Sequence, residues 1–492
     1  YFLHNRCHPF GKTRYFTAVV VVISVWALLP PIVVAVANNI APTSATGASA
    51  ILRLQAYHPE VSPSERFQEL AAICKEYGIE TWDLYGDFHK SASSSGSDDV
   101  SFLRNFEAEL AKEFGKEDAV FMPSGVMAQS IALLIHHSNQ QHQQHHNHKR
   151  KIFACHPTSH LLLHEEEGYR ELCGFSCKVI SPSTISSESA GATSKSSNSY
   201  SELSGAPLLY EHVKGTNLNN VSTLILELPH RELGGKLTPW DDILKMKQHL
   251  AEHQVAFHCD GARMFEASAG YQQSLAELAE PFDSVYVSFY KGLGGLSGAM
   301  LMGNADFCQQ ARVWLRRFGG NLFTLMPYAV SAWGGYQNHW KKLLDVPNGE
   351  NNGSCKRGTS DRFPKNLTFT EKKLKLAGIV EALVGDIDQK EKRYATKIAC
   401  FEPKIPQVNM VHLYLRPTVD DCNRARNIIE KRRGVCVFHR IRSLDRLDSA
   451  YREGYRSMIE ITMGQANGMI PDETWVNSWT EFFQEILRTV HV

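Results

Sequence analysis

Apolar and polar positions along the middle of the chain predict strands joined by amphipathic helices. Apolar residues recur at helical spacing in residues 126–137 and 241–253. Because strand-like and helical segments alternate here, we expect right-handed crossovers and a mainly parallel sheet, and hence an α/β domain. Apolar runs of strand length occupy residues 119–122, 223–228, 254–260, 284–290 and 298–303.

The last third of the chain has a different pattern, with polar segments between fewer apolar runs. We expect a large domain over residues 50–330, then connecting helices and a smaller α+β C-terminal domain over residues 331–492. The strand and helix patterns of this smaller domain occur at residues 408–415, 420–433, 457–463 and 472–490.

The N-terminal part of the chain has the character of a targeting segment. Residues 16–37 carry no charged side chain and are long enough to cross a bilayer. A cleaved signal peptide is the alternative, because the small residues AVA precede Asn38. We therefore expect residues 1–49 to form a targeting segment and a linker, with membrane association or targeting through them and a cytoplasmic location otherwise.

Low-complexity stretches interrupt the predicted domains. Residues 136–151 are rich in His and Gln, residues 181–206 are rich in Ser, and a third stretch covers residues 348–363. We expect the first to be a flexible surface loop and the second a disordered loop, and the third lies near the expected junction between the two domains. The histidines of the first stretch could bind a metal ion, but their spacing defines no ligand set, so we expect no metal site.

Composition narrows the class of function. Lys plus Arg and Asp plus Glu balance at 52 each, so the overall charge gives no indication of nucleic-acid binding. A hydrophobic content of 43% is sufficient for a substantial core. The eleven cysteines include no CxxC pair, which favours reduced thiols over disulfides or zinc ligands.

Candidate chemistry lies at the ends of two neighbouring predicted strands. Asp260 ends one of them, and Lys291 follows the next, just before the Gly-rich segment GLGGLSG. Ligands bind at such strand ends in open α/β sheets. A desolvated lysine can attack a carbonyl, and pyridoxal phosphate (PLP) is a carbonyl cofactor that also needs an acid beside its ring nitrogen. If only these two residues are considered, the alternative fits the sequence equally well: Asp260 caps a strand end and Lys291 is a solvated loop residue without a cofactor.

A second candidate site lies where a predicted strand meets a helix. Ser124, Gly125 and Val126 stand at this helix N-terminus, where free N–H groups can bind a phosphate. Taken alone, a serine cap without a ligand is the simpler interpretation. Arg263, in the segment DGAR, can pair with a substrate carboxylate through its guanidinium group, although a surface ion pair is the alternative.

The segments DGAR, SFYKGLGG and FMPSGVMAQSIALL together resemble the threonine aldolase and aromatic amino acid beta-eliminating lyase family of fold-type-I PLP enzymes. The resemblance runs from about Trp82 to about Tyr328, in the family's order. HPTSHLLLHEEEGYR and LELPHRELGGKL are typical of a divergent branch. The resemblance implies a fold-type-I, PLP-dependent transferase-like architecture with a seven-stranded sheet in the large domain.

The resemblance also implies roles for individual residues. It places PLP on Lys291 and Asp260, its phosphate on the turn at Ser124, Gly125 and Val126, and His160 against its ring. It makes His230 the group that handles the substrate β-hydroxyl proton. It adds Arg263 and Tyr85 as substrate contacts, and Arg263 also borders the cofactor. Because the family counterpart of Tyr85 lies near a subunit boundary, we expect a homodimer or homotetramer.

The chain departs from the family pattern at several positions. Val126 stands where the family usually has Thr, and Phe323 stands where it has an arginine. The family's C-terminal carboxylate-binding arginine should fall near Ile459, where this chain has none. An early segment that carries a serine near the substrate has no convincing match.

These features together predict a PLP-dependent lyase that cleaves L-threonine-like β-hydroxy-α-amino acids to glycine and an aldehyde. β-Elimination or racemisation of an amino acid would use the same cofactor residues and is the alternative among enzymes. A non-catalytic, membrane-attached scaffold is the alternative from another class, and the intact Asp260 and Lys291 pair argues against it.

Overall fold

The computed structural model describes residues 51–80, 82–84, 101–144, 151–182, 205–344, 366–385, 398–446 and 448–489. The predicted targeting segment, residues 16–37, lies outside the described residues, as do Tyr85 and the stretch 348–363. Most of the Ser-rich stretch, residues 183–204, lies outside them as well.

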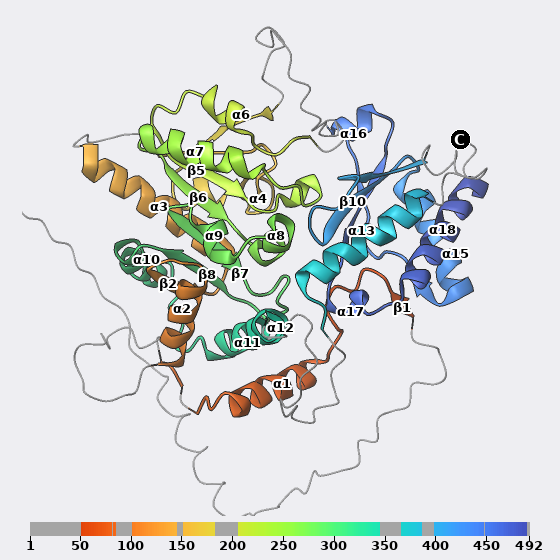
Figure 1. Cartoon of the computed structure of the whole chain (residues 1–492), viewed down its shortest axis with the longest axis horizontal. Helices are drawn as coiled ribbons and strands as arrows, with labels where there is room; N and C mark the ends of the chain where they lie inside the picture. Colours follow the sequence, from red (N-terminus) through yellow and green to blue (C-terminus); the bar gives the residue numbers. More distant parts are fainter. Residues whose placement is uncertain are drawn as a thin grey trace, which may run out of the picture. The chain divides into compact units, whose positions relative to one another are not determined.

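A seven-stranded sheet forms the centre of the large domain, with the strand order β2-β8-β7-β6-β5-β3-β4 (Figure 1). Strand β8 runs antiparallel to both of its neighbours, and the other pairs are parallel. The predicted mainly parallel, seven-stranded sheet is therefore confirmed. The strands are β2 (Asp118–Met122), β3 (Ile152–Cys155), β4 (Ser176–Val179), β5 (Val221–Glu227), β6 (Ala256–Asp260), β7 (Ser284–Ser288) and β8 (Ala299–Gly303).

Helices cover both faces of this sheet, because successive side chains of each strand point to opposite faces and the central strands are buried on both. On β2, Val120 and Met122 pack on the face that carries α3 (Gly125–Gln144) and α10 (Ala305–Arg317). Ala119 and Phe121 belong to the core on the other face. That face carries α2 (Phe102–Glu113), α7 (Trp240–Glu252), α8 (Met264–Tyr271), α9 (Leu275–Ala279) and α11 (Met326–Tyr336).

Shorter elements connect this framework. Helix α1 begins at Pro63 with a capping box, in which the Ser62 hydroxyl accepts from the Glu65 N–H and the Glu65 carboxylate accepts from the Ser62 N–H. A π-helical turn, Gln337–Lys341, follows α11. The remaining elements are α1 (Pro63–Glu76), α4 (His160–Leu163), α5 (Gly168–Glu171), α6 (Tyr210–Lys214), η3 (Arg231–Leu233) and α12 (Lys342–Leu344).

A four-stranded antiparallel sheet of order β12-β13-β10-β9 lies in the C-terminal part of the chain, and its strands β10 and β13 fall in the two segments predicted to be strands. Its core includes Trp475 and Trp479 of the last helix. A short parallel pair, β1 with β11, joins residues near the start of the described chain to this domain. The elements are β1 (Leu52–Arg53), β9 (Ala399–Glu402), β10 (Met410–Leu415), β11 (Val435–Cys436), β12 (Arg442–Ser443), β13 (Ser457–Thr462), α13 (Phe369–Gly385), α15 (Val419–Arg433), α16 (Ser449–Arg452), α17 (Gln465–Gly468) and α18 (Asp472–Thr489).

The prediction of a loop over residues 136–151 is wrong for its first part, because α3 continues to Gln144. The helix is held by buried polar contacts that a low-complexity composition does not reveal. His136 Nε2 lies 2.6 Å from Ser284 Oγ, and Gln140 Nε2 donates to the Val221 carbonyl at 3.1 Å. The polar residues on this side of the helix therefore belong to the interior of the domain.

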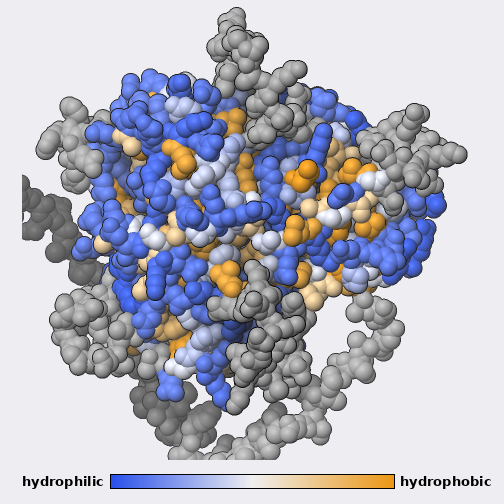
Figure 2. All heavy atoms as spheres, in the orientation of Figure 1, coloured by the Kyte–Doolittle hydropathy of each residue, from blue (hydrophilic) through white to orange (hydrophobic). Residues whose placement is uncertain are grey.

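The visible surface is mainly hydrophilic, with hydrophobic residues scattered between polar ones (Figure 2). Within the part of the chain that the structure describes, no helix combines the length and apolar character needed to cross a membrane.

Candidate active site

Two acidic side chains lie side by side at the carboxyl edge of the large sheet. Glu227 ends β5 and Asp260 ends β6, and the two residues are paired in the register of these strands. Lys291 follows β7, the next strand along the sheet. The sheet thus brings the predicted acid and the predicted amine to one edge and adds a second, buried acid.

Burial and mutual charge shift the ionisation of both predicted groups. Burial raises the pKa of Asp260 to about 7, with the charge of Glu227 adding to the shift and Lys291 opposing it. Burial lowers the pKa of Lys291 to about 8, with Arg263 adding to the shift and Asp260 opposing it. A larger fraction of the lysine is therefore the neutral, nucleophilic amine at neutral pH than for a solvated lysine.

The turn between β2 and α3 is shaped to receive an anion. Ser124 Oγ accepts from the Met127 N–H at 3.4 Å, and the Ser297 hydroxyl donates to the Pro123 carbonyl at 2.7 Å. A methyl group on Gly125 would overlap the phenol of Tyr286, so glycine is required for this close approach. Val126 is 38% exposed and contributes only its backbone N–H. The first N–H groups of α3 are thus available for a phosphate.

His160 begins α4 and is fixed from two sides. Its backbone N–H donates to Glu227 Oε2 at 3.3 Å, and its Nδ1 lies 2.9 Å from Glu165 Oε1. The His160 charge is among those that act on Asp260. The structure therefore places His160 beside the two strand-end acids and identifies Glu165 as the group that orients its ring.

His230 is buried and belongs to a hydrogen-bonded group that the sequence analysis missed. Its Nε2 lies 2.9 Å from Thr158 Oγ1 and 4.0 Å from Glu227 Oε2. Thr158 Oγ1 is also 2.9 Å from His156 Nδ1. Burial lowers the pKa of His156 to about 2, with His230 adding to the shift, so His156 is neutral. The Ala206 carbonyl can only accept, so His156 carries its proton on Nε2.

Arg263 precedes α8 and lines a cavity of about 420 Å³ together with Lys291. Among the described residues no carboxylate lies within 4 Å of its guanidinium, although Glu460 and Glu266 are close enough to raise its pKa against the effect of burial. Its partly buried charge is therefore available to a carboxylate ligand. The small domain contributes Arg440, Arg442 and Glu460 to the same cavity.

Near Ile459, where the family resemblance implies a carboxylate-binding arginine, the chain has an ion pair between Arg231 and Glu460. Glu460, next to Ile459 on β13, lines the cavity and accepts from Arg231 Nε at 2.9 Å. The cavity therefore holds an internal ion pair near the position where the family resemblance implies an arginine. Phe323 is 61% exposed, and Tyr85 lies outside the described residues.

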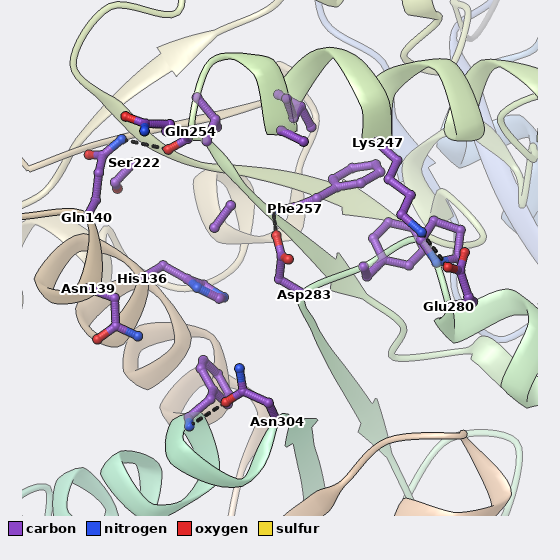
Figure 3. A pocket seen from close by; sticks show the side chains of 17 residues that line it. His136, Asn139, Gln140, Ser222, Lys247, Gln254, Phe257, Glu280, Asp283 and Asn304 are labelled. Atoms are coloured by element: carbon purple, nitrogen blue, oxygen red, sulfur yellow. Dashed lines mark hydrogen bonds and ion pairs between the residues drawn. The ribbon is translucent and has the colours of Figure 1, made fainter. Parts of the chain in front are cut away.

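A second cavity, of about 600 Å³, lies at the opposite, amino ends of the central strands (Figure 3). Figure 3 shows His136 on one side of it and the Lys247–Glu280 ion pair on the other. Because Asp260 and Lys291 are at the carboxyl ends, this larger cavity is separate from the candidate chemistry. Nowhere in the described ranges do three His, Cys, Asp or Glu side chains gather closely enough to hold a metal ion.

Comparison with known proteins agrees with this geometry. A family model described as beta-eliminating lyase matches residues 93–419. A low-specificity L-threonine aldolase from Arabidopsis thaliana is 27% identical over 241 residues, 49% of this chain and 61% of that protein. A low specificity L-threonine aldolase from Escherichia coli K12 is also 27% identical, over 49% of this chain and 60% of that protein. The match thus spans about three fifths of the curated relatives' length.

Among solved structures, one described as an L-allo-threonine aldolase from Listeria monocytogenes EGD-E superposes with a TM-score of 0.64. It is 26% identical, and the superposition covers 90% of this chain and 97% of that one. The similarity therefore extends over both the large and the small domain.

The charges around Lys291 should control its titration in opposite directions. Arg263→Gln removes a positive charge that lowers the Lys291 pKa, so the pKa should rise and amine labelling at neutral pH should slow. Glu227→Gln removes a negative charge that raises it, so the pKa should fall and labelling should quicken. Labelling rates against pH, followed by peptide mass spectrometry, measure both. A wild-type titration near 10.5, the ordinary lysine value, would contradict a desolvated amine.

Proposed function

Because this chain belongs to the beta-eliminating lyase family, we propose that it is a PLP-dependent lyase that cleaves L-threonine-like β-hydroxy-α-amino acids. The products would be glycine and an aldehyde. The observation that carries the proposal is the buried acid Asp260 beside the partly buried amine of Lys291, at one sheet edge with an anion-binding turn. The names of the relatives, which are threonine aldolases, support the substrate class.

The described residues fit PLP. Lys291 would hold the cofactor aldehyde covalently through Nζ, and Asp260 would accept a hydrogen bond from the ring nitrogen. A positive ring nitrogen opposes the effect of burial on Asp260 and favours its ionised form. The Ser124 hydroxyl and the N–H groups of Gly125 and Val126 would bind the phosphate, and His160 would lie against the ring. When bound, PLP supplies an electron sink for the bond that breaks at Cα.

The chain's own groups would then position the substrate and move its protons. Arg263 would bind the substrate carboxylate, because its guanidinium faces the cavity without a carboxylate partner among the described residues. His230 would take the β-hydroxyl proton, directly or through water. Thr158 and Glu227 hold its imidazole in place. Lys291, once released from the cofactor, can return a proton to Cα.

Two other reactions share this machinery. β-Elimination and racemisation would use the same cofactor residues, and no contact in the described cavity favours either over cleavage at Cβ. A panel of β-hydroxy amino acids assayed for both glycine and aldehyde separates the three reactions, because only cleavage forms these two products together.

The attachment of PLP to Lys291 can be tested directly. Borohydride reduction of the PLP-loaded protein should fix a pyridoxyl group on Lys291, which peptide mapping locates. Lys372 is the matched control, because burial also lowers its pKa to about 8. Lys291→Ala should abolish the label and Lys372→Met should retain it. A label on Lys372 in the wild-type protein would refute the assignment.

The role of His230 predicts a split between two reactions. His230→Ala should keep PLP bound and slow cleavage of β-hydroxy amino acids by about 10²–10⁴-fold, the usual share of a general base. Exchange of the glycine Cα proton needs no β-hydroxyl chemistry, so the rate of this exchange should fall less. Arg263→Ala should weaken both reactions together, because it removes the carboxylate anchor. Cleavage by His230→Ala at the wild-type rate would exclude His230 as the base.

We further propose that the protein is a homodimer or homotetramer, with Tyr85 contacting the substrate from the same or a neighbouring subunit. Sedimentation of the PLP-loaded enzyme measures this, and an active monomer would exclude it.

Residues 16–37 are proposed to target or anchor the protein. Fractionation of cells that express the chain with and without residues 1–49 should show a shift from membranes to the soluble fraction.

A further inference from the structure

Tyr286 lies next to two parts of the proposed cofactor site, Asp260 and the turn at Gly125, although no motif identifies it. It is on β7, which lies between β8 and β6 in the sheet (Figure 1). In the register of β6 and β7 it is paired with Asp260, so the two side chains are on the same face of the sheet. That face is covered by α3, and Tyr286 is only 3% exposed.

The phenol of Tyr286 reaches from this strand to the start of α3. The three atoms nearest to a methyl group placed on Gly125 are all from Tyr286, and the hydroxyl oxygen is the nearest. The hydroxyl therefore lies against the backbone of the turn that begins α3. Burial raises the pKa of Tyr286 well above its ordinary value, with Tyr290 and Asp260 adding to the shift, so the group is protonated and can donate.

The position of β7 decides which part of PLP this hydroxyl would meet. Asp260, at the end of β6, would mark the ring nitrogen, and the turn after β2 would mark the phosphate. Strand β7 lies between them, with only β8 separating it from β2. Because the hydroxyl end of Tyr286 is at Gly125, it lies at the phosphate end of the cofactor.

This inference rests on the proposed function and adds a residue to it. We propose that Tyr286 donates a hydrogen bond to the phosphate of PLP and supplies the second side-chain donor of the phosphate site. The turn itself provides one hydroxyl, from Ser124, because Gly125 has no side chain and the side chain of Val126 is apolar. A phenol donating from the neighbouring strand would complete a site that the turn alone leaves short of donors.

The test compares PLP with pyridoxal, which lacks the phosphate. Equilibrium dialysis of the cofactor-free full chain measures the affinity for each. Tyr286→Phe should weaken PLP binding about 10- to 100-fold, the value of a hydrogen bond to a charged group, and leave pyridoxal binding unchanged. Tyr336→Phe is the matched control, because that tyrosine is also buried and its hydroxyl lies 3.4 Å from Glu113 Oε2 on another helix, and it should leave the PLP-to-pyridoxal ratio unchanged.

A second variant tests whether the missing donor is the cause. The double variant Tyr286→Phe, Val126→Thr places a hydroxyl in the turn itself and should recover most of the PLP affinity. Thermal unfolding of the cofactor-free proteins shows whether each variant is folded. Unchanged PLP affinity in Tyr286→Phe, or an equal loss for PLP and pyridoxal, would overturn the assignment to the phosphate. Neither result affects borohydride labelling of wild-type Lys291. A wild-type protein that binds no PLP would instead overturn the proposed function together with this inference.

Discussion

Two carboxylates buried next to each other are the constraint on which the rest of the site depends. Glu227 and Asp260 end adjacent parallel strands, so their charges repel in a region from which water is largely excluded. Such a pair persists only with compensating charges and donors, which Lys291, Arg263 and the N–H groups of His160 and Arg231 provide. Burial is the main cause of both shifts: it lowers the pKa of Lys291, with Arg263 adding to the shift, and raises the pKa of Asp260, with Glu227 adding to the shift. A positively charged ring nitrogen beside Asp260 would relieve the repulsion, which explains why this edge suits PLP.

The large sheet also sets the position of the turn between β2 and α3, which is the proposed phosphate site. Alternate residues of β6 and β7 face α3, so Asp260 and Tyr286 share one surface with the start of that helix. Farther along, His136 of the same helix contacts Ser284, whose hydroxyl also lies 2.6 Å from His258 Nδ1. These buried contacts hold α3 on the sheet, and the position of its N-terminus follows from them.

The small domain contributes part of the cavity lining and is joined to the large domain by ion pairs. Glu232 accepts from Arg442 at 2.7 Å and from His164 at 3.0 Å, so it joins β12 to α4. Lys236 and Glu402 form a fully buried ion pair of 2.8 Å between the segment after η3 and β9. Replacing either residue alone would leave the other as a buried charge without compensation, so the two side chains depend on each other across the contact between the domains. The geometry around His230 is therefore maintained from both domains.

The sequence by itself determined the strand ends that carry Asp260 and Lys291, the turn at Ser124 and Gly125, and the mainly parallel sheet. Apolar periodicity and short motifs specify these because each depends on residues close together in the chain. Only the tertiary structure decided the rest: the helical state of residues 136–144, the link from His230 through Thr158 to His156, the Arg231–Glu460 ion pair, and the contact of Tyr286 with Gly125. Each of these joins residues from different elements, up to 229 positions apart for Arg231 and Glu460. Strand order and register bring such residues together, and no local pattern in the sequence records that order.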